Sequence, residues 1–253
     1  MRVLLLLLVA LGGAFGQTLR VLSYNIHHGE GVDGRLDLER IAKAILSVQP
    51  DVVALQEVDG KTQRTKGVDQ AAELGRLTGM RHFFGPAIAL EGGHYGNAVL
   101  AKVPAVFTRN APLPGKERRA LMEVTLTVGG KKVAFFATHL DAGREETERV
   151  AAAREILKSA RPTHPAVLAG DLNAVMESET MGILGKAWTR AGAPDVHLTI
   201  PVGTPRRQID YVLVQPAKQF RVVEVRVLEE AVASDHRAIF AVLELVNAPS
   251  AVR

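Results

Sequence analysis

The sequence predicts a single α/β domain in which helices cover two β-sheets, a layered sandwich. Two observations support this prediction. Segments with a helical apolar period are interspersed with strand-like segments, some continuously apolar and some alternating. No Ser/Gly/Pro-rich linker, charge block or short repeat divides the 253 residues, of which 47% are hydrophobic and 23% charged. Such a chain can bury one large core, which excludes disorder, collagen-like repeats and a coiled coil.

Residues 1–16 are expected to form a signal peptide, and residues 17–253 the domain itself. Arg2 supplies a short positive region, an apolar run with five consecutive leucines covers residues 3–11, and small residues precede Gln17. This order is typical of a secretory signal, and the run is shorter than the roughly 20 residues of a spanning helix. An uncleaved membrane anchor and a buried first strand are the alternatives. The prediction is a secreted or periplasmic protein whose mature chain has no transmembrane segment.

The N-terminal part of the domain predicts two strands and two helices. Residues 20–25 have the β-branched and aromatic content of a strand. Asp37 can cap a helix that ends before Pro50. The apolar stripe of this helix has a helical period and consists of Leu38, Ile41, Ala42, Ile45 and Leu46. A buried strand is expected over residues 51–55, and a second helix, capped by Asp69, runs through Leu77.

The remainder of the chain predicts mainly short strands. Strands are expected over residues 98–101, 121–128, 132–137, 166–169, 209–214, 220–227 and 238–245. Gly129-Gly130 is a hairpin turn signal between two of them. The Ala-, Glu- and Arg-rich segment 145–159 is expected to be helical.

Carboxylate, amide and imidazole side chains lie where several apolar strands end or begin. They are Asn25, Glu57, His139, Asp171, Asn173, Asp210, Asp235 and His236. Strand ends at one edge of a sheet converge, so we expect these side chains to meet. The set is rich in oxygen and the chain has no cysteine, which excludes thiolate sites. These ligands suit Mg²⁺ or Mn²⁺ better than zinc.

Each of these residues also has an ordinary structural explanation. Asp171 and Asp235 can be turn or cap residues, the commoner use of aspartate after a strand, and a single histidine such as His139 is usually structural. Asp210 is different because a carboxylate inside an apolar strand needs a charged or hydrogen-bonding partner. The joint occurrence favours a functional site.

Six motifs in this order carry a resemblance to a known family. They are Ser23-Tyr24-Asn25-Ile26, Leu55-Gln56-Glu57-Val58, Thr138-His139-Leu140-Asp141, Gly170-Asp171-Leu172-Asn173, Ile209-Asp210-Tyr211 and Ser234-Asp235-His236. The chain resembles the endonuclease/exonuclease/phosphatase family of DNase I-like phosphoesterases over residues 19–245. The resemblance implies a four-layered α/β sandwich, with two mixed sheets packed face to face and helices outside.

The resemblance also implies a metal site. Glu57 would be the principal ligand of Mg²⁺ or Mn²⁺, with Asn25 and Asp235 contributing directly or through water. Phosphate ester hydrolysis needs charge neutralised on the phosphate oxygens, and a bound cation supplies this.

The other motif residues would, by similarity, carry the reaction. Asp171 would orient or deprotonate the attacking water, and Asn173 would hold that water or a phosphate oxygen. His236 would contact the scissile phosphate, with Asp210 accepting a hydrogen bond from its ring. His139, a tyrosine in abasic-site endonucleases, would meet a phosphate oxygen from the opposite side.

Other polar residues are candidates for substrate contact. Asn97 lies in a segment similar to the family's cleft loop, although a glycine-assisted turn explains it equally well. Arg206 and Arg207 precede the Asp210 motif and can face an anion or simply solvent; Arg118-Arg119 carry the same ambiguity. Arg149 lacks the glutamine that often follows three residues later in the family, so a structural role is expected.

The expected function is that of a secreted, metal-dependent hydrolase of phosphate esters, acting on a small-molecule or lipid-headgroup substrate as a monomer. The alternatives are an extracellular DNase I-like endonuclease and a catalytically silent binding protein. Nucleic acid is possible but not required as a substrate. The net charge is only +4 with no basic run, and aromatic residues make up 5% of the chain, which leaves few stacking platforms for bases.

Overall fold

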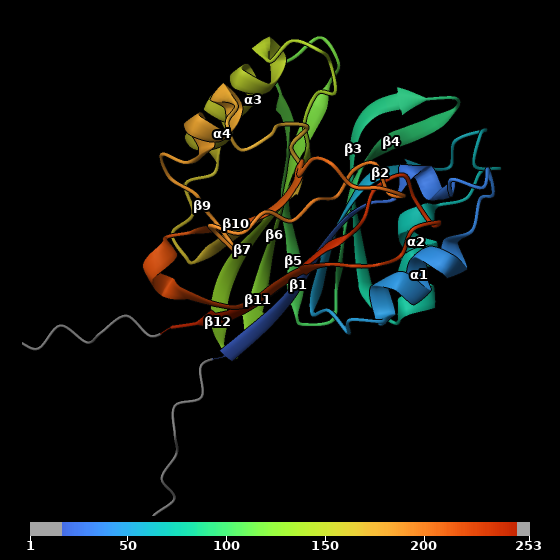
Figure 1. Cartoon of the computed structure of the whole chain (residues 1–253). Helices are drawn as coiled ribbons and strands as arrows, with labels where there is room; N and C mark the ends of the chain where they lie inside the picture. The colour runs from blue at the N-terminus through green and yellow to red at the C-terminus, as the bar shows by residue number, and fades with distance from the viewer. Residues whose placement is uncertain (1–16, 247–253) are drawn as a thin grey trace, which may run out of the picture.

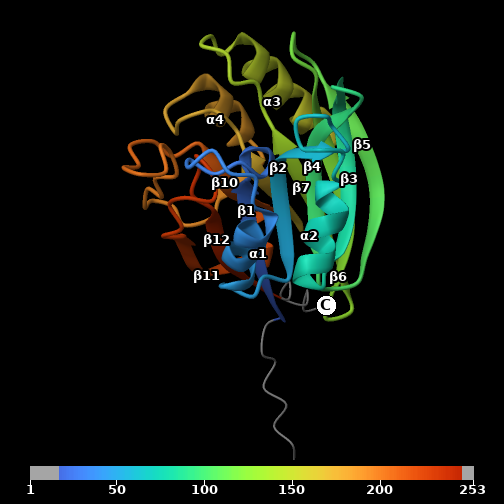
Figure 2. The same cartoon turned by 90° about the vertical axis from the view of Figure 1, so that its right-hand side faces the viewer.

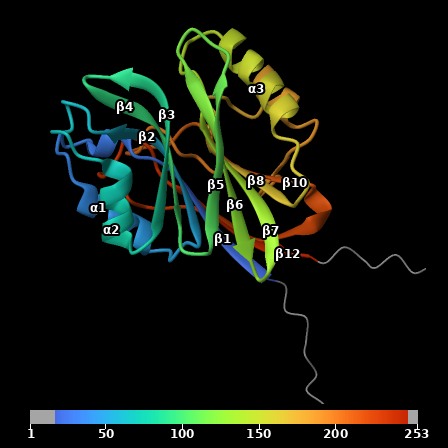
Figure 3. The ribbon, with the colours of Figure 1, turned by 180° about the vertical axis from the view of Figure 1, so that it is seen from behind.

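The computed structural model describes residues 17–246, which form four layers (Figure 1). Two sheets pack face to face, and a helix pair covers each outer face, on opposite sides of the molecule when it is seen from behind (Figure 3). The helices are α1 (Leu38–Leu46), α2 (Gln70–Thr78), α3 (Thr147–Ser159) and α4 (Glu179–Leu184). The predicted four-layered sandwich is confirmed. The expected signal peptide, residues 1–16, lies outside the described residues.

The first sheet contains the N-terminal strand and both C-terminal strands. Its order is β11 (Phe220–Val227), β12 (Ile239–Leu245), β1 (Gln17–Asn25), β2 (Val52–Gly60), β4 (Gly93–Ala101) and β3 (Arg81–Leu90). Strands β1 and β2 run parallel with Asn25 opposite Gln56. Strand β1 ends at Asn25, whereas β2 continues past Gln56 to Gly60, so Glu57 follows the residue opposite Asn25 and lies within its strand. Helices α1 and α2 cover this sheet in Figure 2.

The second sheet is built from the middle of the chain. Its order is β5 (Ala105–Leu113), β6 (Arg119–Val128), β7 (Lys131–His139), β8 (Ala166–Asp171), β10 (Asp210–Gln215) and β9 (Thr189–Arg190). Strands β7 and β8 are parallel with His139 opposite Asp171. Strand β10 is antiparallel to β8, and its first residue, Asp210, also lies opposite Asp171. Three polar residues thus share one edge.

Three apolar clusters hold the layers together. The central cluster lies between the sheets and includes Val21, Val52, Phe135, Val167 and Val212. The other two pack α1 with α2, and α3 with α4, onto the outer sheet faces. Burial of apolar area at roughly 25 cal/mol per Å² drives this packing.

The helix starts follow the predicted caps. Asp37 Oδ1 accepts from Arg40 N at 2.8 Å, and Asp69 Oδ1 accepts from Ala72 N at 3.1 Å. Leu46, predicted to belong to the buried stripe of α1, is instead 44% exposed because the helix ends there.

The hairpin signal is confirmed, whereas the edge strands β3, β5 and β9 were missed. Gly129 and Gly130 have φ of 52° and 78° and connect β6 to β7, the left-handed pair that a tight hairpin turn requires. Strands β3 and β5 contain Pro86 and Pro112 and are largely exposed. Proline is tolerated on edge strands, so the sequence there lacks the apolar pattern of a strand. No helix among residues 17–246 is long and apolar enough to cross a membrane.

Candidate active site

One amide joins the two sheets where their strands end. Asn25, the last residue of β1, donates from Nδ2 to Glu57 Oε1 at 3.0 Å and to Asp171 Oδ2 at 3.1 Å. Asn25 and Glu57 belong to the first sheet, and Asp171 ends β8 of the second. The expectation of a single sheet edge therefore needs correction, because the site forms between the edges of two facing sheets.

Glu57 reaches this position through a β-bulge. The pairing of β2 with β4 shifts register between Leu55 and Val58, and Glu57 has a left-handed φ of 58°. Its neighbours Gln56 and Val58 are fully buried, whereas Glu57 is half-buried. A bulge adds an unpaired residue and changes the direction of a side chain. Glu57 lies in this bulge, and its carboxylate contacts Asn25.

Asp171, Asp210 and His236 form a buried cluster in the second sheet and the loop before β12. Asp210 Oδ2 accepts a hydrogen bond from His236 Nδ1 at 2.9 Å, so the second ring nitrogen, Nε2, faces the site. This Nε2 lies 3.7 Å from Asp171 Oδ2. The three residues are at most 5% exposed, and one ligand-type atom from each lies within 4.8 Å of the others.

Burial and charge set the protonation of this cluster. Burial raises the pKa of Asp171 to about 7, and the negative charge of Asp210 adds to the rise. Burial alone would lower the pKa of His236, but the charge and hydrogen bond of Asp210 outweigh it and raise the pKa to about 10. In the metal-free protein His236 is therefore a cation at neutral pH, and Asp171 can exchange a proton there.

His139 lies on the other side of Asp171 and is neutral. Burial, followed by the positive charges of Arg119 and His236, keeps its pKa well below the usual value. Arg119 Nη1 lies 2.9 Å from His139 Nδ1. Because a guanidinium only donates, Nδ1 must carry the lone pair. The proton is then on Nε2, 3.5 Å from Asp171 Oδ2.

Asn173 fixes the loop after Asp171. Its backbone N–H donates to Asp171 Oδ1 at 2.9 Å, and its Nδ2 donates to Leu140 O at 3.0 Å. Nδ2 also lies 3.1 Å from His139 Nε2, but both groups carry protons, so this is a contact between two donors and not a hydrogen bond. Asn173 has a left-handed φ of 48°, which asparagine tolerates better than most residues. Asn173 is thus anchored to Leu140 and in turn holds Oδ1 of Asp171 in place.

The comparison with protein families identifies the chain at this point. The model of the Endonuclease/Exonuclease/phosphatase family matches residues 22–236. The chain belongs to this family. Members of the endonuclease/exonuclease/phosphatase family are typically metal-dependent phosphoesterases or nucleases.

Solved structures of this family share the fold. An endonuclease/exonuclease/phosphatase from Beutenbergia cavernae DSM 12333 matches with a TM-score of 0.78 at 30% identity, covering 94% of this chain and 74% of that chain. A mannosyl-6-phosphatase from Bacteroides thetaiotaomicron VPI-5482 matches with a TM-score of 0.72 at 18% identity over 90% and 100% of the two chains. The human Nocturnin catalytic domain matches with a TM-score of 0.71 at 19% identity over 91% and 94%. Comparison with curated proteins found no match.

The donor set fits the divalent cation on which the endonuclease/exonuclease/phosphatase family depends. The amide Nδ2 of Asn25, the positive end of that side chain, lies between two carboxylates, where a cation is also favoured. Asn25 Oδ1 accepts from His27 N at 3.0 Å, so this side chain would have to turn for its oxygen to bind metal. Asp235 is half-buried, and Ser234 Oγ, which donates to Asn25 O at 2.7 Å, lies 3.4 Å from Asp235 Oδ1.

The predicted substrate-contact residues differ in their surroundings. Asn97 is buried, with Nδ2 donating to Ala120 O at 3.2 Å and Oδ1 without a partner. Arg206 and Arg207 are exposed, and no hydrogen bond or ion pair among the described residues joins their side chains to the site. Their contact with substrate stays a prediction. Arg149 Nη1 donates to the carbonyl of Asp141 at 3.1 Å, which agrees with the expected structural role.

Arg119, for which the sequence left substrate contact and a solvated surface position open, is buried beside His139 together with Tyr95. Arg119 is 6% exposed; besides His139, it contacts Tyr95 OH at 3.4 Å and Glu117 Oε2 at 3.0 Å. The Tyr95 ring also lies 5.6 Å from the Arg64 guanidinium. An arginine directly before an apolar strand was the available signal for Arg119, and the sequence left its role open.

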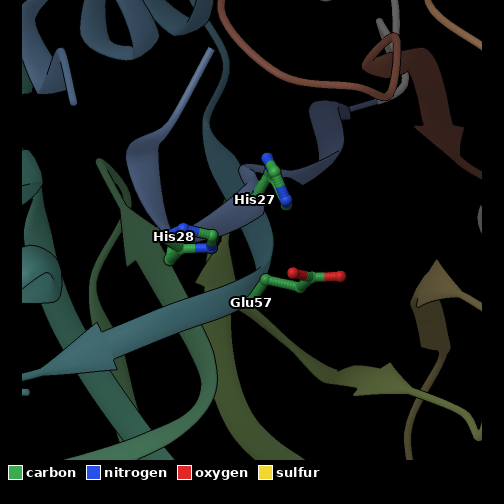
Figure 4. Close-up of side chains that lie close together, drawn as sticks. All are labelled: His27, His28 and Glu57. Carbon is green, nitrogen blue, oxygen red and sulfur yellow. The ribbon is translucent and has the colours of Figure 1, made fainter. Parts of the chain in front are cut away.

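Two histidines next to Glu57 were missed as possible metal ligands. His27, His28 and Glu57 each offer one ligand atom, and these atoms lie within 4.8 Å of one another. Figure 4 shows the two imidazoles beside the Glu57 carboxylate.

Proposed function

We propose that this protein is a metal-dependent hydrolase of phosphate esters, acting as a phosphodiesterase or phosphatase on a small molecule or lipid headgroup. The observation that carries the proposal is the buried Asp210–His236 pair beside Asp171, with Asn25 linking Asp171 to Glu57. A catalytically silent protein would have no need to keep a buried cation, two buried carboxylates and a neutral imidazole together.

Asp210 and His236 provide a positioned proton donor. Asp210 holds the Nδ1–H of the ring, which leaves the Nε2–H available to a phosphate oxygen or a departing alkoxide. The pKa of His236, raised to about 10, keeps this proton on the ring at neutral pH. After the proton leaves, the neutral ring stays oriented by the same hydrogen bond.

Asp171 provides the complementary base. Its pKa of about 7 lies near neutral pH, which is the favourable range for taking a proton from water. Asn173 N–H fixes one carboxylate oxygen, Oδ1, and leaves Oδ2 toward the two imidazoles. Base and acid therefore face each other across a space of a few ångströms.

His139 and Arg119 supply positive electrostatic potential on the other side of Asp171. The Nε2–H of His139 can donate to a phosphate oxygen, and the Arg119 guanidinium behind it carries a permanent charge. When bound, a divalent cation at Glu57, with Asn25 and Asp235, would neutralise charge on the phosphate oxygens. The donor set of carboxylate and amide oxygens favours Mg²⁺ or Mn²⁺ for this role.

A panel of substrates with controlled metal content tests the proposal. The purified protein would be assayed with Mg²⁺, with Mn²⁺ and with EDTA on bis-p-nitrophenyl phosphate, phosphomonoesters including sugar phosphates, phosphoinositides, sphingomyelin, RNA and DNA. Sugar phosphates belong in the panel because a protein of the same fold is a mannosyl-6-phosphatase. We expect metal-dependent turnover of a small phosphoester. Activity confined to DNA would favour the nuclease, and chelator-insensitive activity would contradict the mechanism.

We further propose that the protein is exported. The support is the order of charged, apolar and small residues in segment 1–16. N-terminal sequencing of the protein from its native host should find a chain that begins at or near Gln17. A soluble product in the cytoplasm that retains residues 1–16 would overturn this proposal.

A further inference from the structure

Two histidines beside the active site have no part in the mechanism above. His27 and His28 lie in the short 3-10 turn η1 (His27–Gly29) that follows β1. They lie next to the carboxylate of Glu57, and one ligand-type atom from each of the three residues lies within 4.8 Å of the others (Figure 4). The Asp171 cluster contributes none of these atoms.

Each of the three side chains has a ligand atom to spare. His27 Nδ1 lies 3.1 Å from Glu30 O, so Nδ1 donates to this carbonyl and Nε2 carries the lone pair. A backbone carbonyl on the distal N–H is the usual support of a metal-binding histidine. His28 Nδ1 is buried without a partner. Glu57 uses Oε1 for Asn25, and its Oε2 takes no hydrogen bond from the residues described.

The backbone holds both rings in an unusual conformation. His27 and His28 have left-handed φ values of 46° and 43°. Such a conformation is unfavourable at a non-glycine residue. It is fixed by hydrogen bonds from Glu30 N to His27 O at 2.8 Å and from Gln70 Nε2 to His28 O at 2.6 Å. The backbone of the two histidines is therefore fixed before any ligand arrives, and only their side chains need to adjust.

We propose that His27, His28 and Glu57 bind a borderline divalent ion such as Zn²⁺ or Co²⁺, next to the hard-cation position and sharing Glu57 with it. Imidazole nitrogens favour such ions, whereas Mg²⁺ favours oxygen ligands alone. Ligand atoms around tetrahedral zinc lie about 3.4 Å apart, given Zn–N bonds of about 2.0–2.1 Å. The three atoms lie within 4.8 Å of one another, so they need to close by at most about 1.4 Å, which side-chain rotation can provide.

Three protein ligands would leave one coordination position open. In catalytic zinc sites this open position takes water or substrate. Two ions that share one carboxylate are typically about 3.5–4 Å apart and can contact the same phosphate. The new site would add a second ion to the proposed hydrolase. It rests on that proposed function only because the two ions share Glu57.

The simpler role for the two histidines is packing. Their rings contact each other edge to face, with centroids 4.5 Å apart at an interplanar angle of 63°. If this contact were their whole role, their replacement would alter stability and leave metal binding unchanged.

Co²⁺ binding to the tag-free, EDTA-treated protein separates these roles. Titrations followed by visible absorption and by calorimetry would be run in excess Mg²⁺, without substrate. We expect the wild type to bind one equivalent of Co²⁺. The paired variant His27→Asn/His28→Asn should bind Co²⁺ at least about tenfold more weakly. Asparagine tolerates the left-handed backbone, so the turn should persist.

Two further variants secure the interpretation. His27→Gly/His28→Gly also permits the left-handed turn and removes both rings, so it should lose Co²⁺ in the same way. His164→Asn changes an exposed histidine before β8, the opposite end of that strand from Asp171, and should bind like wild type. Absence of Co²⁺ binding by the wild type, or wild-type affinity in both paired variants, would overturn the site.

The outcome is independent of the hydrolase assay. Co²⁺ binding that depends on the two histidines, in a protein that hydrolyses no phosphoester, would keep the metal site and reject the proposed function. Metal-dependent hydrolysis without a histidine-dependent Co²⁺ site would keep the proposed function and reject the metal site.

Discussion

The imidazole of His236 and the carboxylate of Asp210 form a buried pair, with Nδ1 and Oδ2 2.9 Å apart. The second carboxylate oxygen of Asp210, Oδ1, is buried without a partner. The carboxylate is therefore committed to one histidine, which accounts for a charged residue at the start of an apolar strand. The pair directs His236 Nε2 toward Asp171.

Replacement of Asp210 by asparagine should lower the pKa of His236. Asparagine keeps nearly the same shape but removes the negative charge that raises this pKa to about 10. Burial, which disfavours the charged ring, is then opposed by the smaller contributions of Asp171 and Asp235, so the pKa of His236 should fall from about 10. NMR titration of the imidazole C–H signals in metal-free protein measures this. The signal of His164 serves as an internal control. A His236 pKa that stays at about 10 in Asp210→Asn would contradict the assigned pairing.

Asp210 and His236 should also act as one unit in catalysis. His236→Ala should lower kcat by about 10²–10⁴, the usual loss for a positioned acid or base. Asp210→Asn should lose activity for the same reason, and the double variant should be little worse than His236→Ala alone. Measured kcat values at saturating Mg²⁺, with melting temperatures to monitor folding, test this. Multiplicative losses would show that the two residues work independently.

Glu57→Gln should impair the protein mainly through metal affinity. The amide keeps the volume and one oxygen but loses the charge that favours a divalent cation. Because even partners outside the ligand shell are worth about 10–100-fold in metal affinity, we expect a loss at least that large, partly rescued by excess Mg²⁺. Activity as a function of Mg²⁺ concentration gives the apparent affinity. Glu179→Gln, at an exposed glutamate of α4, is the matched control. An unchanged metal requirement in Glu57→Gln would exclude this ligand.

The site residues at strand ends could be predicted because each one directly follows, or ends, an apolar run in the sequence. In β1, β7 and β8 the apolar run stops at Asn25, His139 and Asp171, and parallel pairing brings such ends together. Glu57 lies in a similar place, although the bulge that directs it could not be seen in an apolar run. The sequence did not predict that the site forms between two facing sheets.

The missed residues depend on features without a sequence period. His27 and His28 lie beside Glu57 because both adopt a left-handed backbone conformation. Histidine residues in a sequence do not predict this conformation. Arg119 reaches His139 through its position opposite the end of β7, which depends on the register of the β6–β7 hairpin. Strands β3 and β5 carry proline at sheet edges, where burial imposes no alternation.

Arg119 should act through His139. Its guanidinium donates to His139 Nδ1 at 2.9 Å and helps to keep the pKa of that ring low. Arg119→Met removes the charge and the hydrogen bond, so the His139 pKa should rise and its tautomer should no longer be fixed. A hydrogen bond from a charged donor is worth about 1.5–3 kcal/mol, which corresponds to a loss of about 10- to 100-fold in kcat.

Two variants separate this positioning role from a structural one. Arg119→Lys keeps a positive charge without the planar fork, so it should restore the low pKa of His139 more fully than the rate. Arg118→Met removes a charge from the exposed neighbouring residue and should change neither the pKa nor kcat. The measurements are NMR titration of His139 and kcat at saturating Mg²⁺. If Arg119→Met lowers the melting temperature while the His139 pKa and kcat stay at the wild-type values, Arg119 serves the fold alone.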